Sequence, residues 1–442
     1  MRDDIVRHLT EHAIRFVRVL WCDNANVVRG KAVHVRALER HMDHGVGITS
    51  AQQAMPVMYD APAPGSGLGP VGEVRLMPDW ATMHALPYAP GSVRVLADMM
   101  LDGAPWALCP RDFCKRMVAE AARAGLEVRA AFESEFYLLR TDGETIVRFD
   151  ETVFGSTLAM DMASAVIGDI ADALHEQGIE VEQYYPESGP GQHEITISPA
   201  TGVDVADRQI AFRETVRGVA LRHGLKAGFL PKIFAHKAGN GCHLHLSLWR
   251  KGRNVFSGDG PHGLSKQGEA FMAGVLDHLP ALMAVTTPSC NSYRRLQPHT
   301  WSGAFRCWGV DNREAALRLP TNPGGAPTNF EFKTVDASAN PYLALGAVIA
   351  CGLDGIRRKL RLPAPLAVDP GELGQRERKK LGIEALPRSL EQALGALGKD
   401  KTLLDALGAP LAQAFMAVRK AEWEALNGVA LEDEVALLLE RY

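Results

Sequence analysis

Two imidazoles and a hydroxyl share one face of a predicted strand. The stretch 242–249, CHLHLSLW, alternates polar and apolar residues, and successive side chains in a strand point to opposite faces. His243, His245 and Ser247 therefore lie on one face, while a cysteine and three leucines form the other, core-facing side. An ordinary solvated strand is the plainer alternative. We favour a functional surface because two histidines rarely gather on such a strand.

Glutamates occupy the polar sides of three further predicted strands. In AAFESEFYLL, Glu133 and Glu135 point the same way, QHEITIS offers Glu194, and NFEFK offers Glu331. Glu187 precedes a Ser-Gly-Pro-Gly turn that can fold it back toward the same surface. Any single strand of this kind is more often a solvated face, but the repetition favours a site. Because clustered carboxylates repel one another without a cation, we expect Mg²⁺ or Mn²⁺ there rather than structural zinc.

The segment 291–320, which we expect to be a long loop, is rich in arginine. Guanidinium groups match phosphate and carboxylate oxygens two at a time, so this density beside a metal site indicates a phosphorylated ligand and an anionic substrate. A basic surface loop with ion pairs is the alternative. Metals with phosphate-binding arginines favour phosphoryl transfer from a nucleotide, although the chain has no phosphate-binding loop motif. The arginines are Arg294, Arg295, Arg306, Arg313 and Arg318.

The elements that must position these residues combine strands and helices. A unit of amphipathic helix, glycine stop and strand occurs three times, which predicts a layered sheet backed by helices. The strands of the three units are predicted over 126–139, 179–187 and 225–234. A proline- and glycine-rich loop over 62–70 is either a lid or a surface excursion. The other predictions are a hairpin over 14–35, a helix over 36–44, strands over 71–77 and 93–99, helices over 110–124, 162–177, 204–223, 265–284 and 341–359, and further helices to the end.

Bulk composition narrows the class of protein. The 442 residues are 46% hydrophobic and 23% charged, with a formal net charge of −4, which is typical of a globular protein that binds small molecules rather than nucleic acid or membranes. Seven cysteines without a paired spacing indicate reduced thiols. No secretory signal and no membrane-spanning run is evident, so we expect a cytoplasmic protein.

Ordered motifs along most of the chain resemble the glutamine synthetase family. They include IRFVRVLWCD, AAFESEFYLL, PESGPGQHEI, FLPKIFAHKAGNGCHLHLSLW, NSYRRL, WGVDNREAALRLP and NFEFKTVDASANPYLALGAVIACGLDGI. The resemblance implies an α+β fold with a small N-terminal β-grasp domain at residues 1–105. A catalytic domain at 106–442 follows, with a curved antiparallel sheet backed by helices. It also implies homo-oligomeric rings, as hexamers or dodecamers, with active sites between adjacent subunits.

Site residues follow from the same resemblance, position by position. Two or three Mg²⁺ or Mn²⁺ ions are implied. One site would use Glu135, Glu187 and Glu194, and a second Glu133, His243 and Glu331. The residues implied for ATP are His245, Ser247, Arg313 and Arg318. Those implied for the acid substrate and for catalysis are Gly239, Arg295 and Arg313, and Trp301 and Lys333 stand at two further site positions where the family has other residues.

Departures from the family pattern bear on the substrate. The family's flap carries a glutamate that binds ammonium, and Trp301 stands at that position here. Ala238 replaces an asparagine that binds glutamate, and Lys333 replaces an arginine. Trp301 offers an apolar face suited to the body of a larger amine or to a cation–π contact. We therefore expect an ATP-dependent ligase that joins the γ-carboxylate of L-glutamate to an amine larger than ammonia through a γ-glutamyl phosphate.

Three other functions remain open at this point. An ordinary glutamine synthetase with an unusual flap would use ammonia. A phosphotransferase like the guanidino kinases would transfer phosphate without ligation. A ring-forming pseudoenzyme would have lost turnover, although retention of all six implied metal ligands weighs against it.

Overall fold

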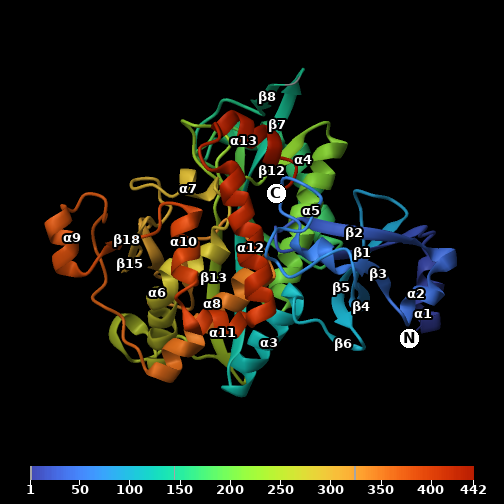
Figure 1. Cartoon of the computed structure of the whole chain (residues 1–442). Helices are drawn as coiled ribbons and strands as arrows, with labels where there is room; N and C mark the ends of the chain where they lie inside the picture. Colours follow the sequence, from blue (N-terminus) through green and yellow to red (C-terminus); the bar gives the residue numbers. More distant parts are fainter. Residues whose placement is uncertain (1, 144, 323–324) are drawn as a thin grey trace.

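Two sheets and a large set of helices make up the chain in this computed structural model, which describes residues 2–143, 145–322 and 325–442. The smaller sheet belongs to the N-terminal part and stands to one side of the larger sheet and its helices (Figure 1). This is the predicted α+β arrangement of a small N-terminal domain and a larger sheet-containing domain.

The N-terminal sheet has the strand order β2-β1-β5-β4-β3, with β6 on the edge of β5. β1 and β5 run parallel and the other pairs are antiparallel. The predicted hairpin is confirmed as β1 and β2, and β4 continues well beyond its predicted end, across a bulge. The strands are β1 (Phe16–Cys22), β2 (Val28–His34), β3 (Val46–Thr49), β4 (Glu73–Ala85), β5 (Ser92–Leu101) and β6 (Ala104–Pro105).

Short helical pieces flank this sheet. The sequence analysis does not predict α1 (Arg2–Glu11), a short helix in which only Leu9 is fully buried. The helix predicted over 36–44 divides into a 3-10 turn, η1 (Val35–Ala37), and a one-turn helix, α2 (Glu39–Met42). A second 3-10 turn, η2 (Ser50–Ala54), follows β3.

The larger sheet has the order β18-β15-β16-β17-β13-β7-β10-β9. Its pairs are antiparallel apart from β15 and β16, which run parallel, so the sheet is mixed rather than wholly antiparallel as predicted. The strands are β7 (Glu127–Asp142), β8 (Thr145–Arg148), β9 (Val181–Pro186), β10 (Gln192–Ile197), β11 (Ala200–Thr201), β12 (Lys226–Gly228), β13 (Cys242–Arg250), β14 (Arg253–Asn254), β15 (Phe305–Val310), β16 (Ala315–Leu319), β17 (Phe330–Phe332) and β18 (Glu384–Ala385).

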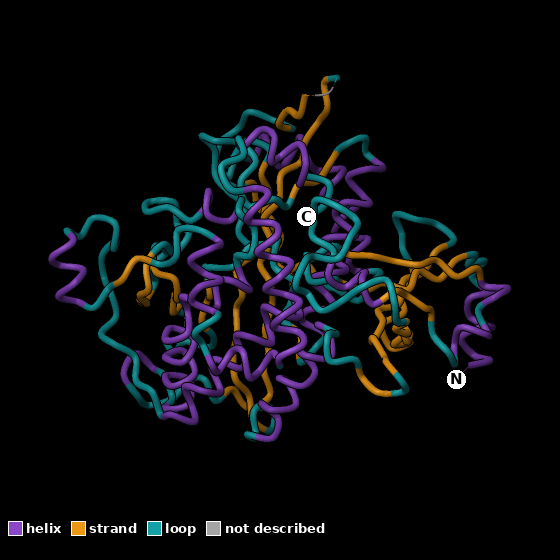
Figure 2. The backbone as a smooth tube through the Cα atoms, viewed as in Figure 1, coloured by secondary structure: helices purple, strands orange, loops and turns teal. Residues whose placement is uncertain are grey.

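Helices cover one face of this sheet, and Figure 2 shows them in front of the strands. The leucines of β13 share a buried cluster with residues of α6 and α8, as the alternating pattern predicts. Asn340 caps α8, its side chain accepting from two backbone N–H groups, and proline follows at the first position. The helices are α3 (Pro110–Arg123), α4 (Thr157–His175), α5 (Asp204–Arg222), α6 (Lys266–Thr286), α7 (Ser292–Arg295), α8 (Pro341–Arg358), α9 (Gln375–Leu381), α10 (Leu390–Leu397), α11 (Lys401–Leu407), α12 (Ala409–Leu426) and α13 (Leu431–Leu438).

One predicted strand is largely wrong. The segment 225–234 was expected to form the strand of the third repeated unit, but β12 has only three residues. Pro231 lacks a backbone N–H, and the chain then folds into a loop. Asn240 holds that loop, since its Nδ2 donates to the carbonyls of Gly228 and Leu230 at 3.1 and 3.0 Å. This loop leads into β13 and forms part of the site described below.

The loop 62–70 docks on α12 of the same chain. The side-chain amide of Gln413 donates to the Gly65 carbonyl at 2.9 Å, and Ala63 and Ser66 are buried. Its residues are absent from the lining of the main cavity described below.

In the described part of the chain, no helix combines the length and apolar character needed to cross a bilayer.

Candidate active site

The register of β13 between its two neighbours brings distant polar residues together. His243 lies opposite Glu133 of β7, and His245 lies opposite Glu331 of β17. Residues directly opposite in an antiparallel pair share one face of the sheet. The predicted polar face is thus a single surface built by three adjacent strands, away from the leucines that pack on the helices.

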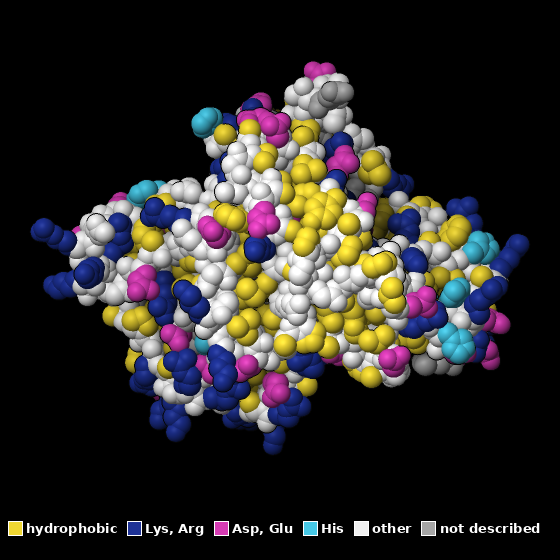
Figure 3. Space-filling view, in the orientation of Figure 1, with side chains coloured by type: hydrophobic (Ala, Val, Ile, Leu, Met, Phe, Trp, Pro, Cys, Tyr) yellow, Lys and Arg dark blue, Asp and Glu magenta, His cyan; other side chains and the backbone are white. Residues whose placement is uncertain are grey.

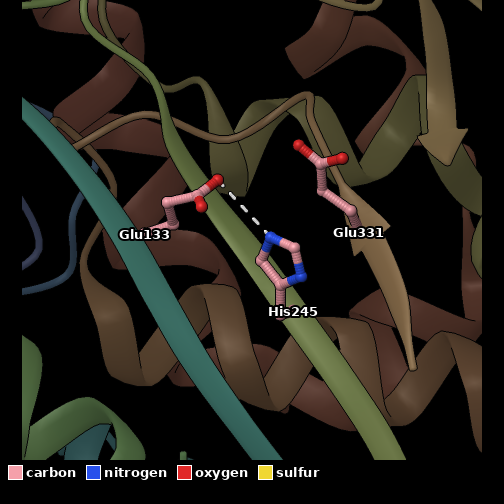
Figure 4. Close-up of side chains that lie close together, drawn as sticks. All are labelled: Glu133, His245 and Glu331. Atoms are coloured by element: carbon pink, nitrogen blue, oxygen red, sulfur yellow. Dashed lines mark hydrogen bonds and ion pairs between the residues drawn. The ribbon is translucent and has the colours of Figure 1, made fainter. Parts of the chain in front are cut away.

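Two glutamates and two histidines make contact on this surface. Glu133 Oε2 lies 3.3 Å from His243 Nδ1 and 3.4 Å from His245 Nε2, and Glu331 Oε1 lies 3.3 Å from His243 Nδ1. One ligand atom from each of Glu133, His245 and Glu331 lies within 4.8 Å of the others. Figure 4 shows these three side chains on neighbouring strands. Which histidine would bind a metal and which would serve ATP stays a prediction.

Burial and the neighbouring charges shift the pKa values of these residues. Burial lowers the pKa of His243 to about 4, and the charge of Lys333 adds to that effect. Burial also lowers the pKa of His245, but its hydrogen bond to Glu133 outweighs this and raises that pKa to about 9. Burial raises the pKa of Glu331, yet the charge of Lys333 holds it below its ordinary value. Lys333 Nζ and Arg318 Nη1 each donate to Glu331 at 3.0 Å.

A second group of carboxylates lies one strand further along. Glu194 of β10 is directly opposite Glu135 of β7, and burial raises the pKa of Glu135 to about 8 and that of Glu194 to about 11. The charge of Glu187 further raises both pKa values. The Tyr185 hydroxyl donates to Glu194, and the Gln192 side chain donates to Glu135 at 3.0 Å. Buried carboxylates this close are stable as anions only beside positive charge.

Both groups fit divalent ions. Carboxylate oxygens with a single type of nitrogen donor, and no thiolate among them, form the donor set that Mg²⁺ and Mn²⁺ prefer. Glu133, Glu331 and a histidine would hold one ion, and Glu135, Glu187 and Glu194 would hold another. Bound there, such ions would neutralise phosphate and carboxylate charge during phosphoryl transfer.

These residues line a cavity of about 1080 Å³. Its size suits a nucleotide with a second substrate, and its walls combine acidic, basic and aromatic side chains. Most of the residues predicted for the site line it, namely Glu133, Glu135, Glu187, Glu194, Gly239, His243, Arg295, Trp301, Arg313, Arg318, Glu331 and Lys333.

Two predicted ATP residues do not line this cavity. His245 lies on the same face of the sheet and contacts Glu133, but it is absent from the cavity lining. Ser247 lies further along β13, where its hydroxyl donates to the Arg129 carbonyl at 3.2 Å and accepts from Trp249 Nε1 at 2.9 Å. Their roles toward ATP stay predictions.

Several lining residues were not predicted. Tyr185 lies on β9 directly opposite Glu194, and the alternation in IEVEQYYPE could have placed it on the polar face. Lys232 and His236 come from the loop before β13, and a strand was expected at Lys232 but not at His236. Phe154 reaches the cavity from the loop before α4 and contacts the Tyr185 ring, at 6.0 Å between centroids. No local sequence signal marked these three loop residues.

Comparisons with known proteins agree with this geometry. Residues 107–437 match the family model of the glutamine synthetase catalytic domain, and residues 2–106 match that of the glutamine synthetase N-terminal domain. The chain is 37% identical to gamma-glutamylpolyamine synthetase GlnA3 of Streptomyces coelicolor, over 95% of this chain and 92% of the relative. It is 31% identical to type-1 glutamine synthetase 1 of Dictyostelium discoideum, over 97% and 90% respectively.

Solved structures give the same result. A crystal structure of a "novel glutamine synthase homolog" has a TM-score of 0.86 and 36% identity, covering 97% of this chain and 99% of the other. A structure described as "GmaS/ADP complex-Conformation 1" also has a TM-score of 0.86, with 32% identity over 98% and 99%. With both domains matched and the acidic site in place, the chain belongs to the glutamine synthetase family of ATP-dependent ligases.

Proposed function

We propose that this enzyme joins the γ-carboxylate of L-glutamate to a primary amine larger than ammonia, with ATP as the energy source. The observation that carries the proposal is Trp301. Its indole is 57% exposed and lines the cavity that also holds the clustered glutamates. The loop 297–303 that carries it, QPHTWSG, contains no carboxylate that could attract a small cation such as ammonium. An aromatic surface at that place favours an acceptor with a hydrocarbon body.

The reaction would proceed in two balanced steps. An oxygen of the glutamate γ-carboxylate attacks the γ-phosphorus of ATP and ADP leaves, which gives γ-glutamyl phosphate. The amine nitrogen then attacks the acyl carbon, phosphate leaves, and the nitrogen loses a proton. Arg313 and Arg318 line the cavity where they would stabilise phosphate charge, and Arg295 would bind the substrate carboxylate.

The relatives support the choice between amine and ammonia only in part. One is called a gamma-glutamylpolyamine synthetase, while others at 31–33% identity are called glutamine synthetases. The acceptor must therefore be determined on this enzyme. Phosphate release with ATP, Mg²⁺ and L-glutamate, measured against ammonia and a panel of mono-, di- and polyamines, is the direct experiment. Ammonia supporting release as well as every amine would exclude the proposal.

A substitution sharpens that experiment. Trp301→Glu places a carboxylate where an ammonium ion could bind and removes the aromatic surface, while Trp301→Phe keeps an aromatic ring. We expect the Glu variant to lose activity with the larger amines and to gain affinity for ammonia. The Phe variant should keep the amine preference of the parent enzyme.

We also propose a homo-oligomeric ring with active sites at subunit boundaries. Phe154 lines the cavity wall and is exposed, and the nearby apolar residues Val153, Leu158 and Met162 in the same stretch of chain are exposed as well. Figure 3 shows further groups of hydrophobic side chains across the middle of the visible face, with other side chains between them. Contiguous apolar surface on a folded chain marks an interaction site. Native mass spectrometry would give the subunit number, and a monomer at assay concentration would exclude the ring.

A further inference from the structure

The loop that carries Trp301 has a backbone that needs outside support. His299 and Trp301 have φ values of 62° and 55°, in the left-handed region that bulky L-residues rarely adopt. Because more than half of the Trp301 side chain is exposed, its own burial does little to hold the loop. Contacts with the rest of the chain must therefore maintain this conformation.

Glu314 supplies one such contact. Its Oε1 accepts a hydrogen bond from the Trp301 backbone N–H at 2.8 Å, and its side chain is 7% exposed. The turn before β16 fixes Glu314 in turn, because the Glu314 N–H donates to Asn312 Oδ1 at 3.0 Å. The adjacent residue, Arg313, lines the main cavity. One turn thus places an arginine at the reacting centre and a buried carboxylate behind the tryptophan loop.

His299 supplies a second contact. Its Nδ1 lies 2.7 Å from Asp369 Oδ2, and the other oxygen of Asp369 accepts from the Gly371 N–H at 2.6 Å. Asn312 contacts the residue next to Asp369, because its Nδ2 donates to the Val368 carbonyl at 3.0 Å. The two contacts of the loop therefore end on two neighbouring segments, the turn at 311–314 and the stretch 368–371, which the hydrogen bond from Asn312 to Val368 joins.

A hollow lies behind the loop. A separate cavity of about 440 Å³ is lined by His299, Trp301, Glu314 and Asp369 together with neighbouring residues. The loop is therefore not packed against an apolar core on this side. It has room to move back, and its position depends on the polar contacts just described.

We infer that Glu314 is a positioning residue for the amine acceptor, which holds the Trp301 loop so that the indole forms the wall of the amine pocket. The inference rests on the proposed function and deepens it, because it assigns the acceptor preference to two residues rather than one. Glu314 touches no substrate in this role and acts through the backbone of Trp301.

The test compares Glu314→Ala with Glu314→Gln. Alanine removes the acceptor, so KM for the preferred amine should rise by about tenfold, the value expected for a lost hydrogen bond to a charged group. Glutamine keeps an oxygen acceptor and should restore most of the affinity. KM for ATP should not change in either variant. An unchanged amine KM in Glu314→Ala, or equal increases for ATP and amine, would overturn the inference.

A double-mutant comparison shows whether Glu314 acts through the tryptophan. In a Trp301→Ala background, Glu314→Ala should raise the amine KM little further, since the group it positions is gone. Full additivity of the two effects would contradict the role. If Glu314→Ala does not fold, His299→Ala removes the second contact and carries the same expectations.

A fluorescence measurement separates this inference from the proposed function. Subtracting the emission of Trp301→Phe from that of the parent enzyme isolates the Trp301 signal, and the same subtraction is made in the Glu314→Ala background. Acrylamide should quench the isolated signal differently in the two backgrounds. Equal quenching would overturn the positioning role. The two proposals can also fail separately. If quenching differs between the backgrounds but ammonia is the best acceptor, Glu314 positions the Trp301 loop and the enzyme is not a ligase for larger amines.

Discussion

Glu194 of β10 lies directly opposite Glu135 of β7, with both carboxylates buried on the same face of the sheet. This arrangement is unfavourable without a cation and favourable with one. Loss of one carboxylate should therefore stabilise the metal-free enzyme, because it removes repulsion, and weaken the metal-bound enzyme, because it removes a ligand.

Glu194→Gln is the variant that shows this difference. It keeps the size of the side chain and removes one buried charge, so Tm of the metal-free enzyme should be unchanged or higher. Affinity for Mn²⁺ should fall by about tenfold or more, since even indirect partners of metal ligands contribute that much. Titration calorimetry with Mn²⁺, and thermal unfolding with and without Mg²⁺, would measure both effects.

Glu182→Gln is the matched control. Glu182 lies on β9, the strand next to β10, but its side chain is exposed and receives a hydrogen bond from Ser198 at 2.9 Å. The same substitution there should change neither Mn²⁺ affinity nor Tm. Equal metal binding by Glu194→Gln and the parent enzyme would remove Glu194 from the ligand set.

Arg295→Lys tests recognition of the acid substrate. Arg295 is 5% exposed, its Nη2 donates to the Val335 carbonyl at 2.8 Å, and its buried Nε has no partner within the described chain. Lysine keeps the charge but lacks the two-pronged donor geometry, so KM for L-glutamate should rise by about tenfold. KM for ATP should stay unchanged in steady-state kinetics.

The neighbouring arginine provides the control for that experiment. Arg294 points elsewhere, with its Nε donating to Glu434 at 2.7 Å and its Nη2 to the Val429 carbonyl at 2.6 Å. Arg294→Lys should leave KM for L-glutamate unchanged even if stability falls. An equal rise in both variants would mean that Arg295 supports the fold rather than the substrate.

A buried histidine between two aspartates predicts a pH-dependent stability. His278 Nδ1 lies 2.6 Å from Asp400 and Nε2 lies 3.1 Å from Asp354. Burial lowers the pKa of His278, but its hydrogen bonds to the two aspartates outweigh this and raise the pKa above its ordinary value. This stabilisation is therefore complete below about pH 6.5, the unfolded value for histidine, and is lost as pH rises through the folded pKa.

His278→Gln should remove that dependence. At pH 6 the variant should lose about 2 kcal/mol of unfolding free energy, as expected for hydrogen bonds between charged groups, and the deficit should shrink in alkaline buffer. His223→Gln serves as the control, because its pair with Asp169 is more exposed and contributes little. Thermal unfolding across the pH range measures both variants, and a deficit that grows with pH would contradict the assignment.

The crossing of α6 and α8 predicts a steric effect. A Cβ added at Gly274 would lie 2.2 Å from the Cys351 carbonyl oxygen and 2.8 Å from Gly355 Cα, so Gly274→Ala should cost about 1–3 kcal/mol of stability. Gly395→Ala, in the exposed part of α10, meets no atom within 4 Å and should be neutral or stabilising. Chemical denaturation would show the contrast, and equal stability of the two variants would refute it.

Local rules account for what the sequence alone determined. Side chains alternate in any strand, so AAFESEFYLL and CHLHLSLW place Glu133 beside Glu135 and His243 beside His245 whatever surrounds them. The start of α8 at Pro341 follows similarly from a capping residue and a proline at the first position. These features depend on bond geometry and nearest neighbours, which the sequence contains in full.

Only the tertiary structure decided which of these surfaces meet. His245 faces Glu331 because β13 pairs with β17 in one register, and a shift by one residue would turn the histidine to the opposite face. The same holds for the parallel pairing of β15 with β16 and for the hydrogen bond from the Trp301 backbone to Glu314. In both cases, neither segment carries a sequence pattern that identifies the other as its partner. The physical reason is that cross-strand and loop partners are chosen by the packing of the whole chain, which no single stretch encodes.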